Sequence, residues 1–397
     1  MDAAPEEATP RLPLEVLFHI IDCTSDWKTC LSCSLVSRAF LEQSRRRVCR
    51  RARLHRLTHL RDFSALVESP VCTIARHVRW LSFEQHHVWA TGGASLDCLR
   101  HLPNLATLRI VGMTSAQNAA GLMNISSCIT SLTLDCVGFV TLEHFKTMLR
   151  ALPELRNLTL ADIFIREQDS AGPAEPMLTK IHSFRCIAWS AFYMSMLTMM
   201  LELPRPPPLA HVDLRVPYIE DRMSSLFCAF LNHFGPTLKA LRLDPGYKHF
   251  VPSEYGAWDV GRLTALRLFT VIPVVLSDWH DIGAAQSVLD LLLLVLRAPV
   301  LRKVVIVLCV SDGRFGNDLT PLNWAILDLH VGRKPQLEQV KFALCGSTST
   351  KMQKIADLIK FLLPKASTKG ILHFGMSTSV GTHCEHIPSE PRTLDLY

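Results

Sequence analysis

One short apolar pattern recurs along most of the chain and limits the folds that it can adopt. The pattern is L-x-x-L-x-L, in which Val, Ile, Phe or Cys can replace Leu, and the intervals between its first eight starts are 24 to 29 residues long. The next two intervals are 38 and 36 residues. The ten starts are Val78, Leu105, Ile129, Leu155, Ile181, Leu209, Leu238, Leu263, Leu301 and Leu337. A period of this size, with one strand and one helix in each unit, predicts a solenoid of stacked repeats.

Candidate helices lie between these strand motifs. They cover residues 142–152, 188–203, 221–234, 284–297 and 351–363. Strands that alternate with helices favour a parallel sheet with the helices packed on one side. We therefore expect an α/β fold in which the strands line the inside of a repeat array and the helices line its outside.

The composition of the chain and its first residues indicate which broad classes of protein to expect. Hydrophobic residues make up 48% of the chain and charged residues 20%, so a packed core is expected and wholesale disorder is not. The longest apolar runs, 291–296 and 304–310, are far shorter than the roughly 20 residues that cross a bilayer. The acidic start lacks the basic-then-apolar order of a secretory signal. We expect a protein of the cytoplasm or nucleus, with its thirteen cysteines reduced.

Three short helices are predicted before the repeats. In LPLEVLFHIID, the residues Leu14, Leu17, Phe18 and Ile21 follow the i, i+3, i+4, i+7 spacing of an amphipathic helix. WKTCLSCS and LVSRAFLEQSRRRVCRR supply the second and third helices. Helices of this size bury little surface by themselves, so a binding partner is implied. The expected organisation is a tail (1–10), a helical domain (11–56), a linker (57–75), the repeat array (76–375) and a C-terminal tail (376–397).

The predicted helical domain resembles the F-box of fungal F-box proteins. The resemblance covers residues 11–50 and rests on LPLEVLFHIID, on Leu31, and on LVSRAF followed by arginines; the Trp frequent in the family is Phe40 here. It implies docking on the Skp adaptor of a cullin-based ubiquitin ligase. The residues implied in that contact or in its immediate support are Leu12, Pro13, Leu17, Ile20, Ile21, Leu31, Val36 and Phe40. The alternative is that they form the core of a small helical cap on the repeats.

The repeats resemble the irregular leucine-rich-repeat arrays of many F-box proteins. The Asn or Cys that the leucine-rich-repeat family places in the turn after the strand is matched at Cys309 and Cys345. Five other units depart from it, with Met113, Val137, Ile163, Trp189 and Pro217. We therefore expect loops of variable length and insertions in the last two units.

A row of polar residues is expected on the inner face of the array. In a strand, the residue between two buried apolar positions points to the opposite face. This places Arg185, Asp213, Arg242 and Arg267 on neighbouring strands, with Arg215 beside Asp213. Because arginine pairs bidentately with carboxylate or phosphate, we expect these residues to bind an acidic or phosphorylated target segment. The alternative is an ordinary solvated strand face.

Positive charge is concentrated in one segment. The chain carries 42 basic and 36 acidic residues, and residues 45–56 hold seven arginines and no acid, so the remainder has a net charge of −1. A protein that binds nucleic acid along its whole surface would be basic throughout. Three interpretations of the cluster remain: a nuclear-import signal, a local contact with an anion, or a solvated helix face.

Motifs for catalysis or metal binding are weak. Cys30 and Cys33 form a C-x-x-C in the middle of a predicted helix, and His55 and His59 share a helix face without a third ligand. HCEH at 383–386 places three ligand types too close together for one tetrahedral metal. We expect no enzyme activity, metal or cofactor. The leading hypothesis is a substrate-recruiting subunit of a Skp–cullin–F-box ubiquitin ligase in ubiquitin-dependent degradation, and the alternative is a repeat-type protein-interaction scaffold without a ubiquitin role.

Overall fold

The computed structural model divides the chain into two compact units. The first unit comprises Met1–Leu155 and Ile165–Asp169, and the second comprises Arg156–Phe164 and Ser170–Tyr397. The structure describes residues 12–377 except 25, 85–95, 114–121, 123, 124, 126, 168–176, 188–190, 216–220, 245–257, 276–281, 311–322 and 347.

The first unit begins with the helices α1 (Leu14–Cys23), α2 (Trp27–Val36) and α3 (Arg38–Val48), and further helices alternate with parallel strands after them. These further helices are α4 (Leu57–Glu68) and α6 (Leu142–Arg150), with short 3-10 turns η1 (Ala75–His77) and η2 (Asp97–His101). The strands β1 (Arg51–Leu54), β2 (Trp80–Glu84), β3 (Thr107–Val111) and β4 (Ser131–Asp135) pair in this order. A separate two-stranded sheet joins β5 (Gly138–Thr141) to β7 (Phe164–Glu167).

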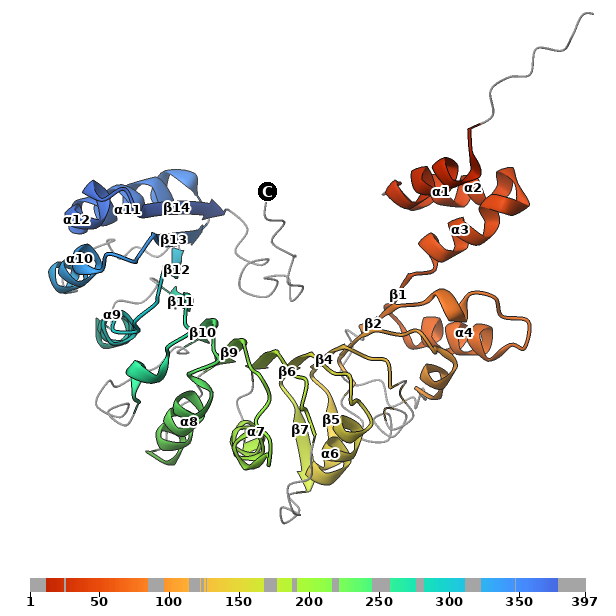
Figure 1. Ribbon diagram of the computed structural model, residues 1–397, viewed down its shortest axis with the longest axis horizontal. Coiled ribbons are helices and arrows are strands. Elements are labelled where there is room, and N and C mark those ends of the chain that lie inside the picture. Colours follow the sequence, from red (N-terminus) through yellow and green to blue (C-terminus); the bar gives the residue numbers. More distant parts are fainter. Residues whose placement is uncertain are drawn as a thin grey trace, which may run out of the picture. The chain divides into compact units, whose positions relative to one another are not determined.

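The second unit continues the alternation of strand and helix. Its sheet has the order β6 (Asn157–Ala161), β8 (Ser183–Ile187), β9 (His211–Arg215), β10 (Ala240–Asp244), β11 (Leu268–Val275), β12 (Lys303–Val310), β13 (Gln339–Gly346) and β14 (Leu372–Ser377). Its helices are α7 (Ala191–Glu202), α8 (Asp221–Phe234), α9 (Ile282–Val295), α10 (Trp324–Arg333), α11 (Ser349–Leu362) and α12 (Pro364–Thr368), and η5 spans Val260–Arg262. Figure 1 shows α7 to α11 on one side of these strands.

The predicted α/β class with parallel strands and helices is confirmed. In the five-residue strands β3, β4, β6, β8 and β10, the second and fourth positions are buried and the others are partly exposed. This period of two is what a sheet with one covered face requires. The buried strand side chains, such as Leu108 and Ile110, are 0% exposed and belong to the core beneath the helices.

The turns after the strands use apolar packing where the leucine-rich-repeat family uses a polar side chain. Met113, Val137 and Ile163, three of the departures from that family pattern, are 2%, 0% and 1% exposed. The residue before each of them, Gly112, Cys136 and Asp162, has a positive φ of 82°, 51° and 46°. The chain therefore makes a similar tight turn with a buried apolar residue in place of a hydrogen-bonding Asn or Cys.

Two segments near the start of the array differ from the expectation. Residues 51–54, expected to end the helical domain, form β1 and pair with β2. Most of the expected linker forms α4, in which Leu60, Phe63 and Val67 are buried. The sheet therefore begins directly after α3.

The described cysteines are free thiols. Among the helices that the structure describes, none combines the length and the apolar composition that crossing a membrane requires.

Candidate functional site

Side-chain caps begin the second and third of the N-terminal helices. Asp26 begins α2 because its carboxylate accepts hydrogen bonds from the backbone of Lys28 (3.3 Å) and Thr29 (2.9 Å). Ser37 separates α2 from α3 and accepts a hydrogen bond from Phe40 N at 3.3 Å. The Arg47 guanidinium in α3 donates to Thr24 O at 3.3 and 3.4 Å, which ties α3 to the end of α1.

These helices expose an unusual number of large apolar side chains. Of the fourteen exposed large hydrophobic residues in the described part of the chain, seven lie between residues 12 and 36. Their exposed fractions are Leu12 58%, Leu14 43%, Val16 42%, Ile20 51%, Leu31 39%, Leu35 87% and Val36 72%. We call these seven residues the N-terminal apolar surface. Apolar residues that gather in this way mark interaction surfaces more often than solvated ones.

The structure separates the residues implied by the F-box resemblance into two groups. Leu12, Pro13, Ile20, Leu31 and Val36 are exposed. The other three, Leu17, Phe40 and Ile21, are half-buried or buried, and Ile21 is 3% exposed.

Ile21 therefore packs inside the three-helix group, in the supporting position that the resemblance allowed. Leu14, Val16 and Leu35 are exposed but were not among the implied residues. Leu14 follows the apolar spacing of the first helix, and it is nevertheless 43% exposed.

The C-x-x-C motif occupies the fourth and seventh positions of α2. Cys30 is 2% exposed, and burial raises the pKa of its thiol. A protonated, buried thiol is a packing group. His55 contacts Glu84 at 3.8 Å and His59 is exposed. The HCEH segment lies outside the described residues.

Three of the four residues predicted to form the polar row lie side by side on the sheet of the second unit. The backbone register aligns Thr159 with Arg185, Arg185 with Asp213, and Asp213 with Arg242. Asp213 Oδ2 lies 3.2 Å from Arg185 Nε and 3.6 Å from Arg242 Nε. The three side chains are 18–20% exposed. We call Arg185, Asp213 and Arg242 the inner-face triad.

The charges of the triad act on one another. Burial raises the pKa of Asp213, and Arg242 and Arg185 oppose that rise. One row away on the same strands, Arg215 Nε contacts Asp244 Oδ2 at 3.1 Å. Three guanidinium groups therefore share two carboxylates on this part of the face, which leaves a small positive excess.

The predicted position of Arg267 is wrong. Arg267 precedes β11, is exposed, and its backbone carbonyl accepts hydrogen bonds from Arg302 N and Lys303 N. Thr270 occupies the place beside Arg242. The motif starts at Leu266 instead of Leu263, and both leucines are fully buried, so the apolar pattern fits two frames three residues apart.

An apolar side chain interrupts the row further along the sheet. Thr270 aligns with Val305, and Val305 aligns with Lys341. Val305 is partly buried and packs against a cluster of Ile272, Val307, Cys309 and Cys345, which are 2–7% exposed. The uncharged positions Thr270 and Val305 therefore separate the inner-face triad from Lys341.

No protein-family model matches the chain, and a search of curated proteins finds no match.

Proposed function

We propose that the protein is a substrate-recruiting subunit of a Skp–cullin–F-box ubiquitin ligase. In this proposal α1, α2 and α3 dock on the Skp adaptor, and the polar face of the second unit holds a target protein for ubiquitin transfer by other subunits. The chain itself performs no chemistry on the target. The resemblance of residues 11–50 to the F-box names the partner, and the exposure of the side chains supplies the physical argument.

The N-terminal apolar surface carries the proposal. Seven large apolar side chains within 25 residues of the sequence stay exposed, although the three helices pack with one another and bury Ile21 and Cys30. Burying one such side chain is worth about 1.5–3 kcal/mol. A partner that buried several of these side chains would gain enough binding free energy to hold the helices firmly, as an adaptor must.

The target face supports the second half of the proposal. Arg185, Arg242 and Arg215 present guanidinium groups near Asp213 and Asp244 on neighbouring strands. Guanidinium groups at strand spacing fit carboxylate or phosphate groups along an extended segment. The two aspartates fix the arginines in place and disfavour a target of uniformly high negative charge.

Isothermal titration of the purified adaptor into the full-length chain tests the docking half. Changing Ile20, Leu31 and Val36 to serine should weaken binding at least a hundredfold, because three exposed anchors contribute about 1–3 kcal/mol each. The matched control changes Val71, Ile326 and Phe361 to serine; these side chains are 82%, 40% and 80% exposed outside the three helices. The control should bind like the unmodified chain.

If the unmodified chain does not bind the adaptor, or if both triple variants bind equally well, the F-box interpretation is wrong. The N-terminal helices would then be a cap, and the protein a repeat-type interaction scaffold without a ubiquitin role.

A further inference from the structure

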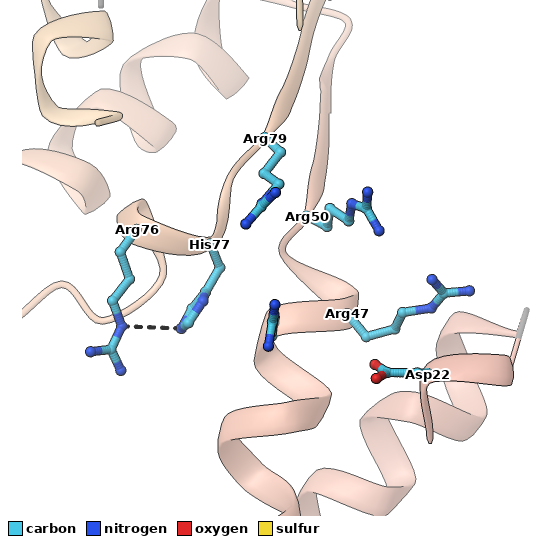
Figure 2. Close-up of a pocket in the computed structure, with 7 residues that line it drawn as sticks. Asp22, Arg47, Arg50, Arg76, His77 and Arg79 are labelled. Carbon is cyan, nitrogen blue, oxygen red and sulfur yellow. Dashed lines mark hydrogen bonds between the residues drawn. The ribbon is translucent and has the colours of Figure 1, made fainter. Parts of the chain in front are cut away.

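A basic pocket lies between the N-terminal helices and the first strands of the first unit. Its volume is about 370 Å³, and it is lined by Asp22, Arg46, Arg47, Arg50, Arg76, His77 and Arg79. Asp22 lies near the end of α1, Arg46 and Arg47 lie in α3, and Arg50 follows α3. Arg76 and His77 lie in η1, and Arg79 directly precedes β2. Figure 2 shows side chains from both segments around one space.

Backbone contacts bring the two segments together. Arg79 N and Trp80 N both donate to Arg50 O at 3.0 Å, at the point where β1 begins to pair with β2. This pairing places arginines from positions 46–50 beside those from positions 76–79. The pairing of β1 with β2 therefore holds these positively charged side chains near one another, although they repel each other.

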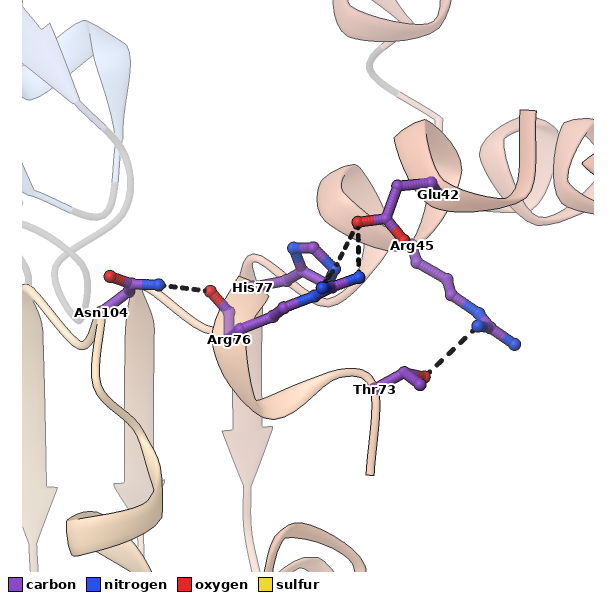
Figure 3. Close-up of polar contacts among 6 residues, drawn as sticks. All are labelled: Glu42, Arg45, Thr73, Arg76, His77 and Asn104. Atoms are coloured by element: carbon purple, nitrogen blue, oxygen red, sulfur yellow. Dashed lines mark hydrogen bonds and ion pairs between the residues drawn. The ribbon is translucent and has the colours of Figure 1, made fainter. Parts of the chain in front are cut away.

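Polar contacts fix the wall of the pocket on its other side (Figure 3). Glu42 Oε1 contacts Arg76 Nη2 at 2.8 Å and His77 Nε2 at 3.2 Å. Asn104 donates to Arg76 O at 2.7 Å, and Arg45 donates to Thr73 at 3.3 Å. The 3-10 turn η1 is thus tied both to α3 and to the segment before β3.

Three guanidinium groups of the pocket have no partner. Within the part of the chain that the structure describes, the side chains of Arg46, Arg50 and Arg79 make no hydrogen bond or ion pair. Arg47 donates to the neutral carbonyl of Thr24, and Arg76 shares Glu42 with His77. Five guanidinium groups therefore face two carboxylates, those of Asp22 and Glu42, and such an excess within one pocket favours a bound anion.

We propose that this pocket binds a compact anion that carries at least two phosphate groups. Arginine presents donors in a planar fork that matches phosphate oxygens bidentately, and several forks around one space match several phosphates. The anion would contact α3 on one side and the start of β2 on the other, and would hold the N-terminal helices against the first strand.

The surroundings favour a compact ligand over a nucleic acid. The other arginines of the 45–56 cluster do not extend the pocket, since Arg45 contacts Thr73 and the Arg53 guanidinium stacks over Trp80 at 5.3 Å. Outside residues 45–56 the chain has a net charge of −1, which does not favour contact with a long phosphate backbone. Asp22 and Glu42 would repel an extended polyanion.

Isothermal titration with inorganic tripolyphosphate tests the proposal on the full-length chain without any adaptor. We expect one site per chain, and we expect orthophosphate to bind much more weakly. Changing Arg46, Arg50 and Arg79 to glutamine should weaken tripolyphosphate binding about a hundredfold or more, because three charge-assisted contacts are lost. Folding should be retained, because these side chains hold no other group.

The matched control removes the same charge from nearby exposed positions, Arg51, Arg56 and Arg61. This variant should bind tripolyphosphate within a few-fold of the unmodified chain. Equal weakening in both variants would show general attraction and overturn the proposal. Absence of measurable binding, or equal affinity for orthophosphate, would also overturn it.

A second arm identifies the source of the phosphates. Vesicles containing phosphatidylinositol bisphosphate are sedimented with the chain in the presence and absence of tripolyphosphate. Co-sedimentation that tripolyphosphate abolishes supports the site with a lipid headgroup as ligand. Tripolyphosphate binding without co-sedimentation supports it with a free anion as ligand. Co-sedimentation that tripolyphosphate leaves unchanged, and that the Arg46, Arg50 and Arg79 variant retains, contradicts the site.

Discussion

At the scale of single residues, His77 is a titratable group that the fold of the first unit largely buries. Its side chain is 10% exposed and faces Glu42 in α3 and Arg76 in η1. Burial lowers the pKa of His77 below its ordinary value of 6.5; Glu42 opposes this, and the charges of Arg76, Arg46 and Arg45 add to it. The neutral imidazole is therefore the form that the fold favours.

A lowered histidine pKa makes stability depend on pH. The folded chain binds fewer protons than the unfolded chain at pH values between the two pKa values of His77, so the stabilisation is present above pH 6.5 and is lost as the pH falls through the folded value. Changing His77 to glutamine should reduce the loss of melting temperature between about pH 7.5 and about pH 5. An unchanged loss in the variant would show that other groups cause the pH dependence.

At the scale of elements, a buried lysine side chain binds backbone carbonyl groups at the end of one helix of the second unit. The Lys334 ammonium donates to the carbonyls of Leu296 at 2.7 Å and Ala298 at 2.6 Å, directly after α9. Lys334 is 9% exposed, and burial lowers its pKa. The carbonyls at this end of α9 are thus satisfied by a side chain that follows α10 in the sequence.

Changing Lys334 to alanine should lower the free energy of unfolding by about 2–3 kcal/mol, because two carbonyls would lose a charged donor. Urea unfolding followed by circular dichroism measures this. Lys354, an exposed lysine in α11, is the control, and its change to alanine should alter stability by less than about 0.5 kcal/mol. Equal effects at the two positions would contradict the assigned role of Lys334.

The inner-face triad also belongs to the element scale, because three neighbouring strands supply it. Changing Arg185 and Arg242 to glutamate should abolish capture of the target and leave adaptor binding unchanged, since charge reversal on the face repels an acidic segment. Affinity purification followed by quantitative mass spectrometry compares the proteins that co-purify with each variant. A milder change of both arginines to glutamine, with melting temperatures for both variants, separates lost recognition from lost folding.

Arg205 and Arg267 provide a matched double charge reversal. Both are exposed in the same unit and lie outside the row. Their change to glutamate should leave the co-purifying proteins unaltered. If the two double variants lose the same proteins, or if neither loses any, the triad is a solvated face and recognition lies elsewhere.

Sequence periodicity predicts the strands and helices of the array well, and it fails where two patterns compete. The helices predicted at 142–152 and 221–234 match α6 and α8 within two residues, because each follows a buried strand after a regular interval. Arg267 was misplaced because Leu263 and Leu266 both satisfy the apolar motif and are both buried. β1 was missed because arginines at positions 51 and 53 hide its alternation.

Contacts between segments far apart in the chain could not be predicted from the sequence. The arginine cluster at 45–56 was evident, but its pairing with Arg76 and Arg79 depends on the alignment of β1 with β2. Glu42 and His77 meet 35 positions apart for the same reason. The N-terminal apolar surface was indicated in part, since the F-box resemblance named four of its seven residues but could not show that Ile21 is buried.

At the scale of the whole molecule, the surfaces proposed to bind different partners lie on different units. The first unit carries the N-terminal apolar surface and the basic pocket, and the second unit carries the inner-face triad. We therefore expect that substitutions on one of these surfaces abolish binding there and leave binding at the other surfaces intact.

The most direct test of this account is reconstitution of purified full-length chain, Skp adaptor and cullin, followed by size-exclusion chromatography with light scattering. We expect the unmodified chain and the variant with glutamate at positions 185 and 242 to elute with adaptor and cullin in a complex containing one copy of each. The variant with serine at positions 20, 31 and 36 should elute alone. Elution of the unmodified chain apart from the adaptor would contradict the proposed role as a substrate-recruiting subunit.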